Sequence, residues 1–279
     1  MSNEQRPVAV ITGAASGIGR GLAEHAARLG MRLVLADLDG PGLQALCDEL
    51  QAGGAQAIAC VTDVGDLAQV ERLRDIALDH FGGVDLLFNN AGVMQTGYSW
   101  EITAQQWQRM LNVNLTGVIN GIRSFVPLFL RQGRAAHVIN TASLAGLLSS
   151  PLMAPYNVTK QAVVALSETL HYELGMLGVP VSVSVVCPGP VASEIMASNQ
   201  VVDAAGSSFS QLLDSSIRQG MTPSELAEQV FAAIAEKRFW VFPHKGFKPA
   251  LERRVQSILE ETNPQFQMTD VEGNADAAR

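Results

Sequence analysis

Short apolar runs typical of strands alternate with longer helical stretches along most of this chain of 279 residues. We expect strands at 7–12, 32–37, 55–61, 84–89, 136–142, 180–187 and 239–243. The helices expected between them cover 17–29, 40–52, 67–81, 103–131, 155–177 and 222–236. Several of these strands are apolar on both faces, as strands are when helices cover both sides of a parallel sheet. The alternation therefore predicts an α/β fold with a doubly wound parallel sheet of about seven strands.

We interpret residues 1–262 as a single domain, because no repeat, linker or change of composition divides them. Two regions do not follow the alternation. Residues 194–220 have no clear period, and a long irregular segment in a compact domain is typical of a disordered loop or of a lid over a functional site, which is the interpretation we adopt. The polar and acidic residues 263–279 are expected to form a flexible tail.

The composition argues against several classes of protein. Hydrophobic residues make up 47% and charged residues 16%, which suffices for a sizeable core, and the net charge of −8 argues against nonspecific binding of nucleic acid. No run approaches the roughly 18 apolar residues that span a bilayer, and the start lacks the apolar segment of a signal peptide. Three cysteines without metal-binding spacing are expected to be reduced thiols: Cys47, Cys60 and Cys187. These features predict a soluble, cytoplasmic protein with no membrane partner.

A glycine-rich segment follows the first expected strand. The sequence TGAASGIG carries Gly13, Gly17 and Gly19 where the strand becomes a helix. Glycines there let the backbone approach a pyrophosphate, and the helix start offers N–H groups and a positive dipole end to it. Together with Ser16 and Ile18, these glycines predict a dinucleotide site, although a plain glycine-rich turn has the same spacing.

Acidic residues follow the second and third expected strands. Asp37 lies at a separation suited to a carboxylate that bonds the adenosine ribose. A carboxylate there repels the 2′-phosphate of NADP, and neither Ser16 nor Leu38 is a cation that would bind it, so NAD is expected rather than NADP. Asp63 and Val64 are expected at the adenine edge. Taken alone, Asp37 is equally a strand-end turn residue, and Asp63 a helix cap.

Tyr156 precedes Lys160 by four residues, just inside an apolar run. Residues four apart on a helix share a face, so the ammonium can approach the phenol. A phenol ordinarily has a pKa of about 10. A nearby ammonium, together with the positive nicotinamide ring of an oxidised cofactor, would lower that pKa. The pair is either an acid–base centre or a satisfied polar pair at a helix start.

Six motifs occur in one order between residues 8 and 193: TGAASGIG, NNAG, NVNLTG, NTASLAG, YNVTK and PGPVAS. In this order they resemble the short-chain dehydrogenase/reductase superfamily. The resemblance implies a single-domain Rossmann fold, often with strand order 3-2-1-4-5-6-7. It also implies an NAD(P)-dependent oxidoreductase that acts on CH–OH groups, without specifying the substrate.

The resemblance implies a role for each of several residues. Tyr156 would exchange the hydroxyl proton of the substrate, while Lys160 would bond the nicotinamide ribose. Ser143 would position the substrate oxygen, and Asn114 would hold a water of the proton relay. Further residues match cofactor contacts of the family: Asn90, Ala91, Gly92, Pro188, Gly189, Val191 and Ser193. The family usually has threonine at the last of these, and the serine keeps the hydroxyl but loses a methyl group.

The residues expected around the substrate are mostly apolar: Met94, Leu144, Met153, Ile195 and Met196. They favour a hydrophobic secondary alcohol or ketone. No metal is expected, because the five histidines are scattered and lack ligand spacing. The apolar helices at 103–131 and 155–177 form a subunit contact in the family, which implies a homodimer or homotetramer. The alternatives are an NADP-preferring carbonyl reductase of the same family and a non-catalytic dinucleotide-binding regulator.

Overall fold

The structure is a computed structural model that describes residues 6–197, 199 and 204–266. Its strands are β1 (Val8–Thr12), β2 (Arg32–Asp37), β3 (Gln56–Val61), β4 (Leu86–Asn89), β5 (Ala136–Thr141), β6 (Val181–Val186) and β7 (Trp240–Val241). The α-helices are α1 (Gly17–Arg28), α2 (Gly40–Ala52), α3 (Leu67–Phe81), α4 (Ala104–Leu111), α5 (Gly117–Gln132), α6 (Ala154–Leu177), α7 (Ala204–Arg218), α8 (Pro223–Ala235) and α9 (Lys248–Leu259). Every expected strand and helix is present, with bounds that shift by no more than two residues.

The described residues form one seven-stranded sheet in the order β3-β2-β1-β4-β5-β6-β7, and every pair of neighbours is parallel. The predicted α/β class, strand number and strand order are confirmed. The order reverses between β1 and β4, which are neighbours in space although two other strands separate them in the chain. In an open α/β sheet, ligands bind in the crevice at such a reversal.

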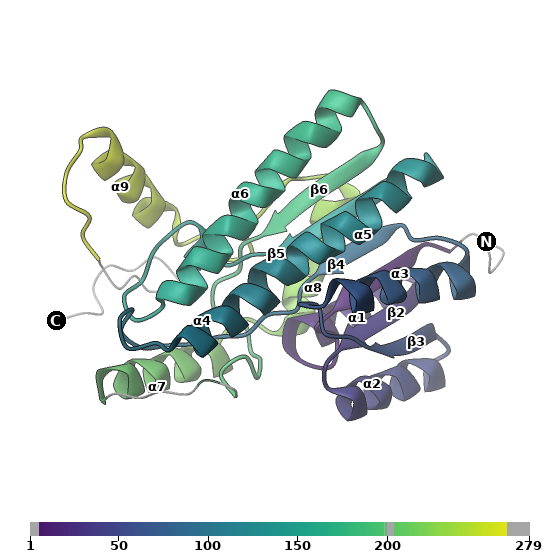
Figure 1. Cartoon of the computed structure of the whole chain (residues 1–279), viewed down its shortest axis with the longest axis horizontal. Coiled ribbons are helices and arrows are strands. Elements are labelled where there is room, and N and C mark those ends of the chain that lie inside the picture. Colours follow the sequence, from purple (N-terminus) through teal and green to yellow (C-terminus); the bar gives the residue numbers. More distant parts are fainter. Residues whose placement is uncertain (1–5, 198, 200–203, 267–279) are drawn as a thin grey trace.

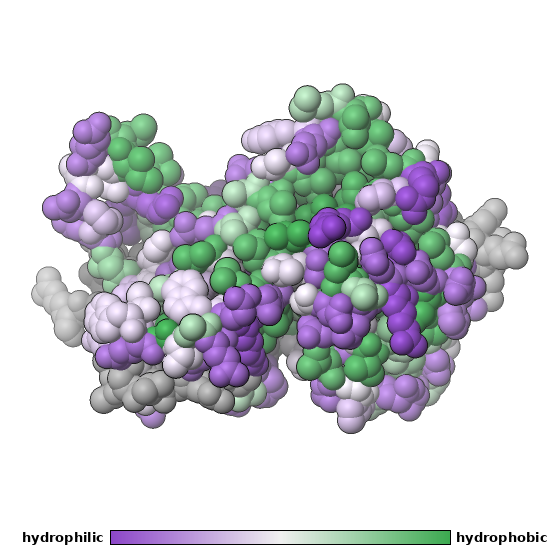
Figure 2. Space-filling model, in the orientation of Figure 1, coloured by the Kyte–Doolittle hydropathy of each residue, from purple (hydrophilic) through white to green (hydrophobic). Residues whose placement is uncertain are grey.

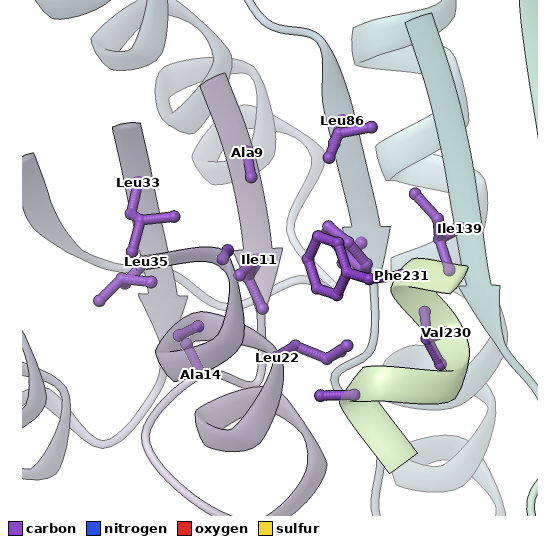
Figure 3. Packing of buried hydrophobic residues seen from close by; sticks show 14 of the residues in the cluster. Ala9, Ile11, Ala14, Leu22, Leu33, Leu35, Leu86, Ile139, Val230 and Phe231 are labelled. Atoms are coloured by element: carbon purple, nitrogen blue, oxygen red, sulfur yellow. The ribbon is translucent and has the colours of Figure 1, made fainter. Parts of the chain in front are cut away.

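Helices cover both faces of the sheet, as the strand composition predicts (Figure 1). On β1, Ala9 and Ile11 point to the face covered by α1, α2 and α8, while Val8 and Val10 point to the face covered by α3, α5 and α6. Figure 3 shows the first of these layers, in which Phe231 of α8 lies against β1 and β4. The inner strands β1 and β5 are therefore buried on two sides, while the edge strand β3 is partly exposed.

Two helices were not expected from the sequence. Residues 194–220 include α7, so the prediction of an irregular segment there is wrong for its second half. The helix α9 also lies where no element was expected, and none of its residues is buried. In Figure 1, α9 stands apart from the layers on either side of the sheet. Most of the predicted flexible tail (267–279) and part of the predicted lid (198 and 200–203) lie outside the described residues.

The expected helix 103–131 is one continuous rod from Ala104 to Gln132 that contains a π-helical segment, η2 (Asn112–Thr116). By length and composition it could cross a membrane, but 56% of its most apolar stretch is buried inside the protein. Core helices of soluble proteins pass the same test, so this helix is weak evidence for a membrane span.

Gly21 sets the contact between α1 and α8. A Cβ at this position would lie 2.6 Å from the Cβ and the carbonyl oxygen of Pro223. We therefore predict that Gly21→Ala lowers the free energy of unfolding by about 1–3 kcal/mol, because the two helices must move apart. Denaturant unfolding followed by circular dichroism measures this.

The matched control is Gly175→Ala in α6, where a Cβ would meet no atom within 4 Å. This variant should gain about 0.5–1 kcal/mol from the lower entropy of the unfolded chain. Equal stability of the two variants would contradict the proposed steric role of Gly21.

Candidate functional site

The carboxyl ends of the strands border a cavity with a volume of about 1890 Å³. It extends from the β1–α1 loop, past the ends of β4 and β5, to the segment after β6 and to α7 and α9. Every residue predicted to bind the cofactor lines this cavity, as do Ser143, Tyr156 and Lys160. The structure thus brings together residues that are up to 180 positions apart in the sequence, from Gly13 to Ser193.

The glycine loop approaches its neighbours too closely for side chains. Gly13 has φ +67°, a left-handed conformation that favours glycine. A Cβ on Gly19 would overlap the carbonyl oxygen of Gly13, and a Cβ on Gly17 would lie 2.7 Å from the Cβ of Ser193. The loop is therefore a backbone surface on the cavity wall, which suits close contact with a phosphate.

The start of α1 leaves its amide groups available. Ser16 is the N-cap residue, yet its side chain makes no capping hydrogen bond. Beside it, the Asp37 carboxylate accepts the N–H groups of Ala15 at 2.9 Å and of Asp39 at 3.0 Å. Uncapped N–H groups attract an anion such as a phosphate. The nearby Asp37 carboxylate repels any further negatively charged group placed beside it. These residues fit the pyrophosphate of a dinucleotide and the ribose next to it.

A hydrogen-bonded group of side chains closes the floor of the crevice between β1, β4 and β5. The Thr12 hydroxyl donates to the Phe88 carbonyl at 3.1 Å and accepts the N–H groups of Asn90 at 2.9 Å and Ala91 at 3.1 Å. The Asn90 amide donates to the Thr12 carbonyl at 3.0 Å and accepts from the Thr141 hydroxyl at 3.2 Å. These bonds fix where the NNAG segment leaves the sheet.

Tyr156 and Ser143 meet on the wall of the cavity. Tyr156 lies in the first turn of α6 and is 7% exposed, and its hydroxyl interacts with the Ser143 side chain. Ser143 follows β5, where its Oγ also accepts the N–H of Ala145 at 3.2 Å. Both hydroxyls line the same cavity, where a substrate oxygen can contact both.

Lys160 is buried one turn further along α6. Its Nζ donates to the carbonyl of Thr141 at 2.8 Å and lies 5.6 Å from the centre of the Tyr156 ring. Burial lowers the pKa of Lys160 to about 8, because the charged form loses its hydration. The nearby Cys187 thiol is also buried, and burial raises its pKa to about 12. Neither Thr141 nor Cys187 was predicted as a site residue from the sequence, although Thr141 lies within the NTASLAG motif and Cys187 directly precedes PGPVAS.

The tyrosine's environment differs from the one expected. Burial raises the pKa of Tyr156 to about 12, while the interaction with the Ser143 side chain opposes the rise. The sequence led us to expect a lowered pKa, with Lys160 and an oxidised cofactor acting together. Lys160 does not supply this alone, because its Nζ is bonded to the Thr141 carbonyl and stands over the ring, while desolvation acts on the phenolate directly.

Asn114 lies behind the cavity wall on the π-helical segment 112–116. An extra residue in a helical turn is frequent at functional sites. The Asn114 side chain is fully buried, and it accepts the N–H of Val93 at 2.8 Å and donates to the Val93 carbonyl at 3.0 Å. A Cβ on Gly92 would lie 3.5 Å from Asn114 Oδ1 and 3.6 Å from Lys160 Nζ. The glycine thus keeps open the space between these two side chains.

The segment after β6 is pinned on two sides. The carbonyl of Pro188 accepts the N–H of Leu144 at 2.9 Å, and that of Pro190 accepts the N–H of Met221 at 3.1 Å. The Ser193 hydroxyl donates to the backbone carbonyl two residues earlier, at 3.1 Å. These bonds hold the segment along the cavity next to the Ser143–Tyr156 pair.

Apolar side chains form the end of the cavity beyond Tyr156. Four of the predicted substrate residues line it: Met94, Leu144, Met153 and Ile195. Met196 is not among the lining residues, which corrects that prediction; its side chain is 9% exposed and packs in the apolar cluster with Met94, Met110 and Tyr156. One face of α7 adds residues that sequence reasoning missed: Phe209, Leu213 and Ile217. Their spacing of four residues is a helical signal that would have identified them.

Among the described residues, no group of three or more His, Cys, Asp or Glu side chains is arranged to hold a metal ion. The described cysteines Cys47, Cys60 and Cys187 are buried free thiols.

Comparisons with known proteins agree with this geometry. A family model described as short chain dehydrogenase matches residues 7–202. The chain is 30% identical to a CLA biosynthesis dehydrogenase/reductase from Lactiplantibacillus plantarum, over 97% of this chain and 99% of that protein. It is 37% identical to a 1-deoxy-11-beta-hydroxypentalenate dehydrogenase from Streptomyces exfoliatus, over 91% of this chain and 89% of that protein.

A solved structure is also closely similar. It is a short chain dehydrogenase/reductase from Burkholderia phymatum in complex with NAD, with a TM-score of 0.92 and 41% sequence identity. The alignment covers 96% of this chain and 100% of that chain.

The depressed pKa of Lys160 predicts a pH dependence of stability. The folded-state pKa of about 8 lies below the ordinary 10.5. The unfolded chain therefore binds more protons between these values, and the lysine's destabilising effect disappears as the pH rises through this window. We predict that the Tm of the wild type, relative to that of Lys160→Met, increases from pH 7 to pH 9.5.

Differential scanning fluorimetry of both proteins in matched buffers measures this difference. Replacement of the exposed Lys245 by Met serves as the control for the loss of a lysine at the surface. A Tm difference for Lys160→Met that stays constant over this pH range would contradict the buried, depressed ammonium.

Proposed function

The chain belongs to the short-chain dehydrogenase/reductase superfamily and is an oxidoreductase acting on CH–OH groups, and from this we propose that it transfers a hydride between NAD(H) and a secondary alcohol or its ketone. The observation that carries the proposal is the Ser143–Tyr156 hydroxyl pair, with Lys160 beneath it, in the cavity bordered by the glycine loop.

The residues present fit the cofactor. The glycine backbone and the uncapped start of α1 would hold the pyrophosphate, and Asp37 would bond the adenosine ribose. Asp63 and Val64 would border the adenine, and the segments 90–92 and 188–193 would border the nicotinamide half. When bound, NAD supplies the hydride acceptor and a positively charged ring.

In this proposal Tyr156 exchanges the proton of the substrate hydroxyl. During oxidation its oxygen accepts that proton as general base, and during reduction it returns a proton as general acid. Ser143 donates a hydrogen bond to the substrate oxygen and so sets its distance from the phenol. The Lys160 ammonium stabilises the phenolate, an effect that the low dielectric of the buried site strengthens.

Asn114 would extend the proton path. Its Oδ1 and the Lys160 Nζ both border the space beside Gly92. A water held there would connect the lysine with the outside of the site, so that the proton taken up by Tyr156 is passed on. Because Asn114 is bonded to the backbone of Val93 through both side-chain atoms, its orientation is fixed.

The substrate proposed is a hydrophobic alcohol or ketone. The cavity beyond Tyr156 is lined by methionine, leucine, isoleucine and phenylalanine side chains, which gain from excluding water. The helix α7 would act as part of a lid, as proposed for residues 194–220. The relatives named as a hydroxypentalenate dehydrogenase and a CLA biosynthesis dehydrogenase/reductase are in keeping with a substrate of this kind.

We also propose that the protein is a homodimer or homotetramer in the cytoplasm, with residues 1–262 as one domain. Apolar residues gather over α5 and α6 on the face shown in Figure 2. Several large side chains of these two helices are exposed in the single chain: Leu130, Val158, Tyr172, Met176 and Leu177. A second copy of the chain would remove them from water.

The proton-transfer role predicts the effect of Tyr156→Phe. This variant should bind NADH like the wild type but lose at least about 100-fold in kcat, because general acid–base groups contribute that much or more. NADH absorbance at 340 nm during incubation with a panel of hydrophobic secondary alcohols identifies a substrate and measures kcat. Tyr172→Phe, on the exposed face of α6, is the matched control. Near-normal turnover of Tyr156→Phe would refute the mechanism.

The position of Asp37 predicts the cofactor preference. The wild type should have a higher kcat/KM for NAD than for NADP, because the carboxylate repels the 2′-phosphate. Asp37→Ser should lose about tenfold in kcat/KM for NAD and gain with NADP, while Asp48→Ser on α2 should change neither value. A wild type that uses both cofactors equally well would show that Asp37 does not select NAD.

A further inference from the structure

His244 holds the segment after β6 from the side of β7. The strands β6 and β7 are parallel neighbours, so the chains leaving them emerge at the same edge of the sheet, next to the cavity. The N–H of Gly189 donates to Nδ1 of His244 at 3.0 Å. The imidazole also interacts with the backbone of Pro190, which has no N–H and therefore accepts.

The opposite side of this segment is held by β5. The Pro188 carbonyl accepts the N–H of Leu144 at 2.9 Å and the hydroxyl of Ser143 at 3.4 Å. The Pro188–Gly189 peptide thus lies between Ser143 on one side and His244 on the other. A change on the His244 side would alter the distance between this wall and the Ser143–Tyr156 pair.

The hydrogen bond to Gly189 requires an acceptor at Nδ1, and a protonated imidazole offers none. Burial lowers the pKa of His244, which favours the neutral ring. His244 is half-buried and does not line the cavity, whereas Pro188 and Gly189 do. Any effect of His244 on the site therefore acts through the backbone of Gly189 and Pro190.

We infer that His244 is a positioning residue: its Nδ1 fixes the Gly189 peptide and thereby the cavity wall that faces the nicotinamide half of the cofactor and the reacting oxygen. The inference rests on the proposed function. No histidine was implicated by the sequence, because 55 positions separate Gly189 from His244 and only the β6–β7 pairing brings them together.

The test compares His244→Leu, which removes the acceptor, with His244→Asn, whose side-chain oxygen can take the place of Nδ1. The Kd for NADH is measured by fluorescence titration, and amide hydrogen exchange is followed in peptides that cover 187–192. We expect His244→Leu to bind NADH about three- to tenfold more weakly, because it loses one hydrogen bond. Its backbone amides in peptides covering 187–192 should exchange hydrogen faster than those of the wild type. In His244→Asn, the Kd for NADH and the amide exchange rate at 187–192 should both lie within about twofold of the wild-type values.

His80→Leu, which removes an exposed histidine from α3, is the control and should leave both measurements unchanged. Wild-type NADH affinity and exchange in His244→Leu would overturn the inference, as would equal losses in the Leu and Asn variants. A wild type that binds NADH but oxidises no alcohol would instead refute the proposed reaction while leaving the His244 comparison valid. A wild type that binds neither NADH nor NADPH would overturn both.

Discussion

The pairing of β1 with β4 is the constraint on which the rest of this protein depends. Because these strands are adjacent, the chain leaves β1 toward one face of the sheet and leaves β4 toward the other, which opens a crevice between them. Thr12 and Asn90 close the floor of that crevice with hydrogen bonds between the two strands. The glycine loop on one side and the ends of β5 and β6 on the other then form its walls.

Burial determines the electrostatics of the site. Tyr156 and Lys160 are both nearly inaccessible to water, and desolvation opposes the charged form of each. The result is a phenol that resists ionisation and an ammonium that is easily discharged, in a region where an added charge acts over a low dielectric. Such a pair responds strongly to a positive charge brought into the cavity. In our account this sensitivity couples proton exchange at Tyr156 to the oxidation state of the cofactor.

Much of the fold was predictable from the sequence, because the strands of a parallel sheet are short apolar runs and the helices between them are periodic. Helices α2 and α3 have the predicted bounds, and the side chains of Asp39 and Asp66 cap their N-terminal ends. The helix α7 was missed because its apolar residues are separated by serines and face a cavity, and α9 because it buries no residue. The motifs located the site, but contacts such as Gly189–His244 depend on strand pairing and have no local signal.

Positive charge in the cavity would convert Tyr156 from a phenol that resists ionisation into a base. Ultraviolet difference absorption near 295 nm, recorded across pH 7–10 with and without saturating NAD⁺ and corrected by subtracting the Tyr156→Phe spectrum, measures this conversion. We expect a phenolate band in this range only with NAD⁺, since the pKa of Tyr156 is about 12 in the chain alone. Identical titrations with and without NAD⁺ would contradict it.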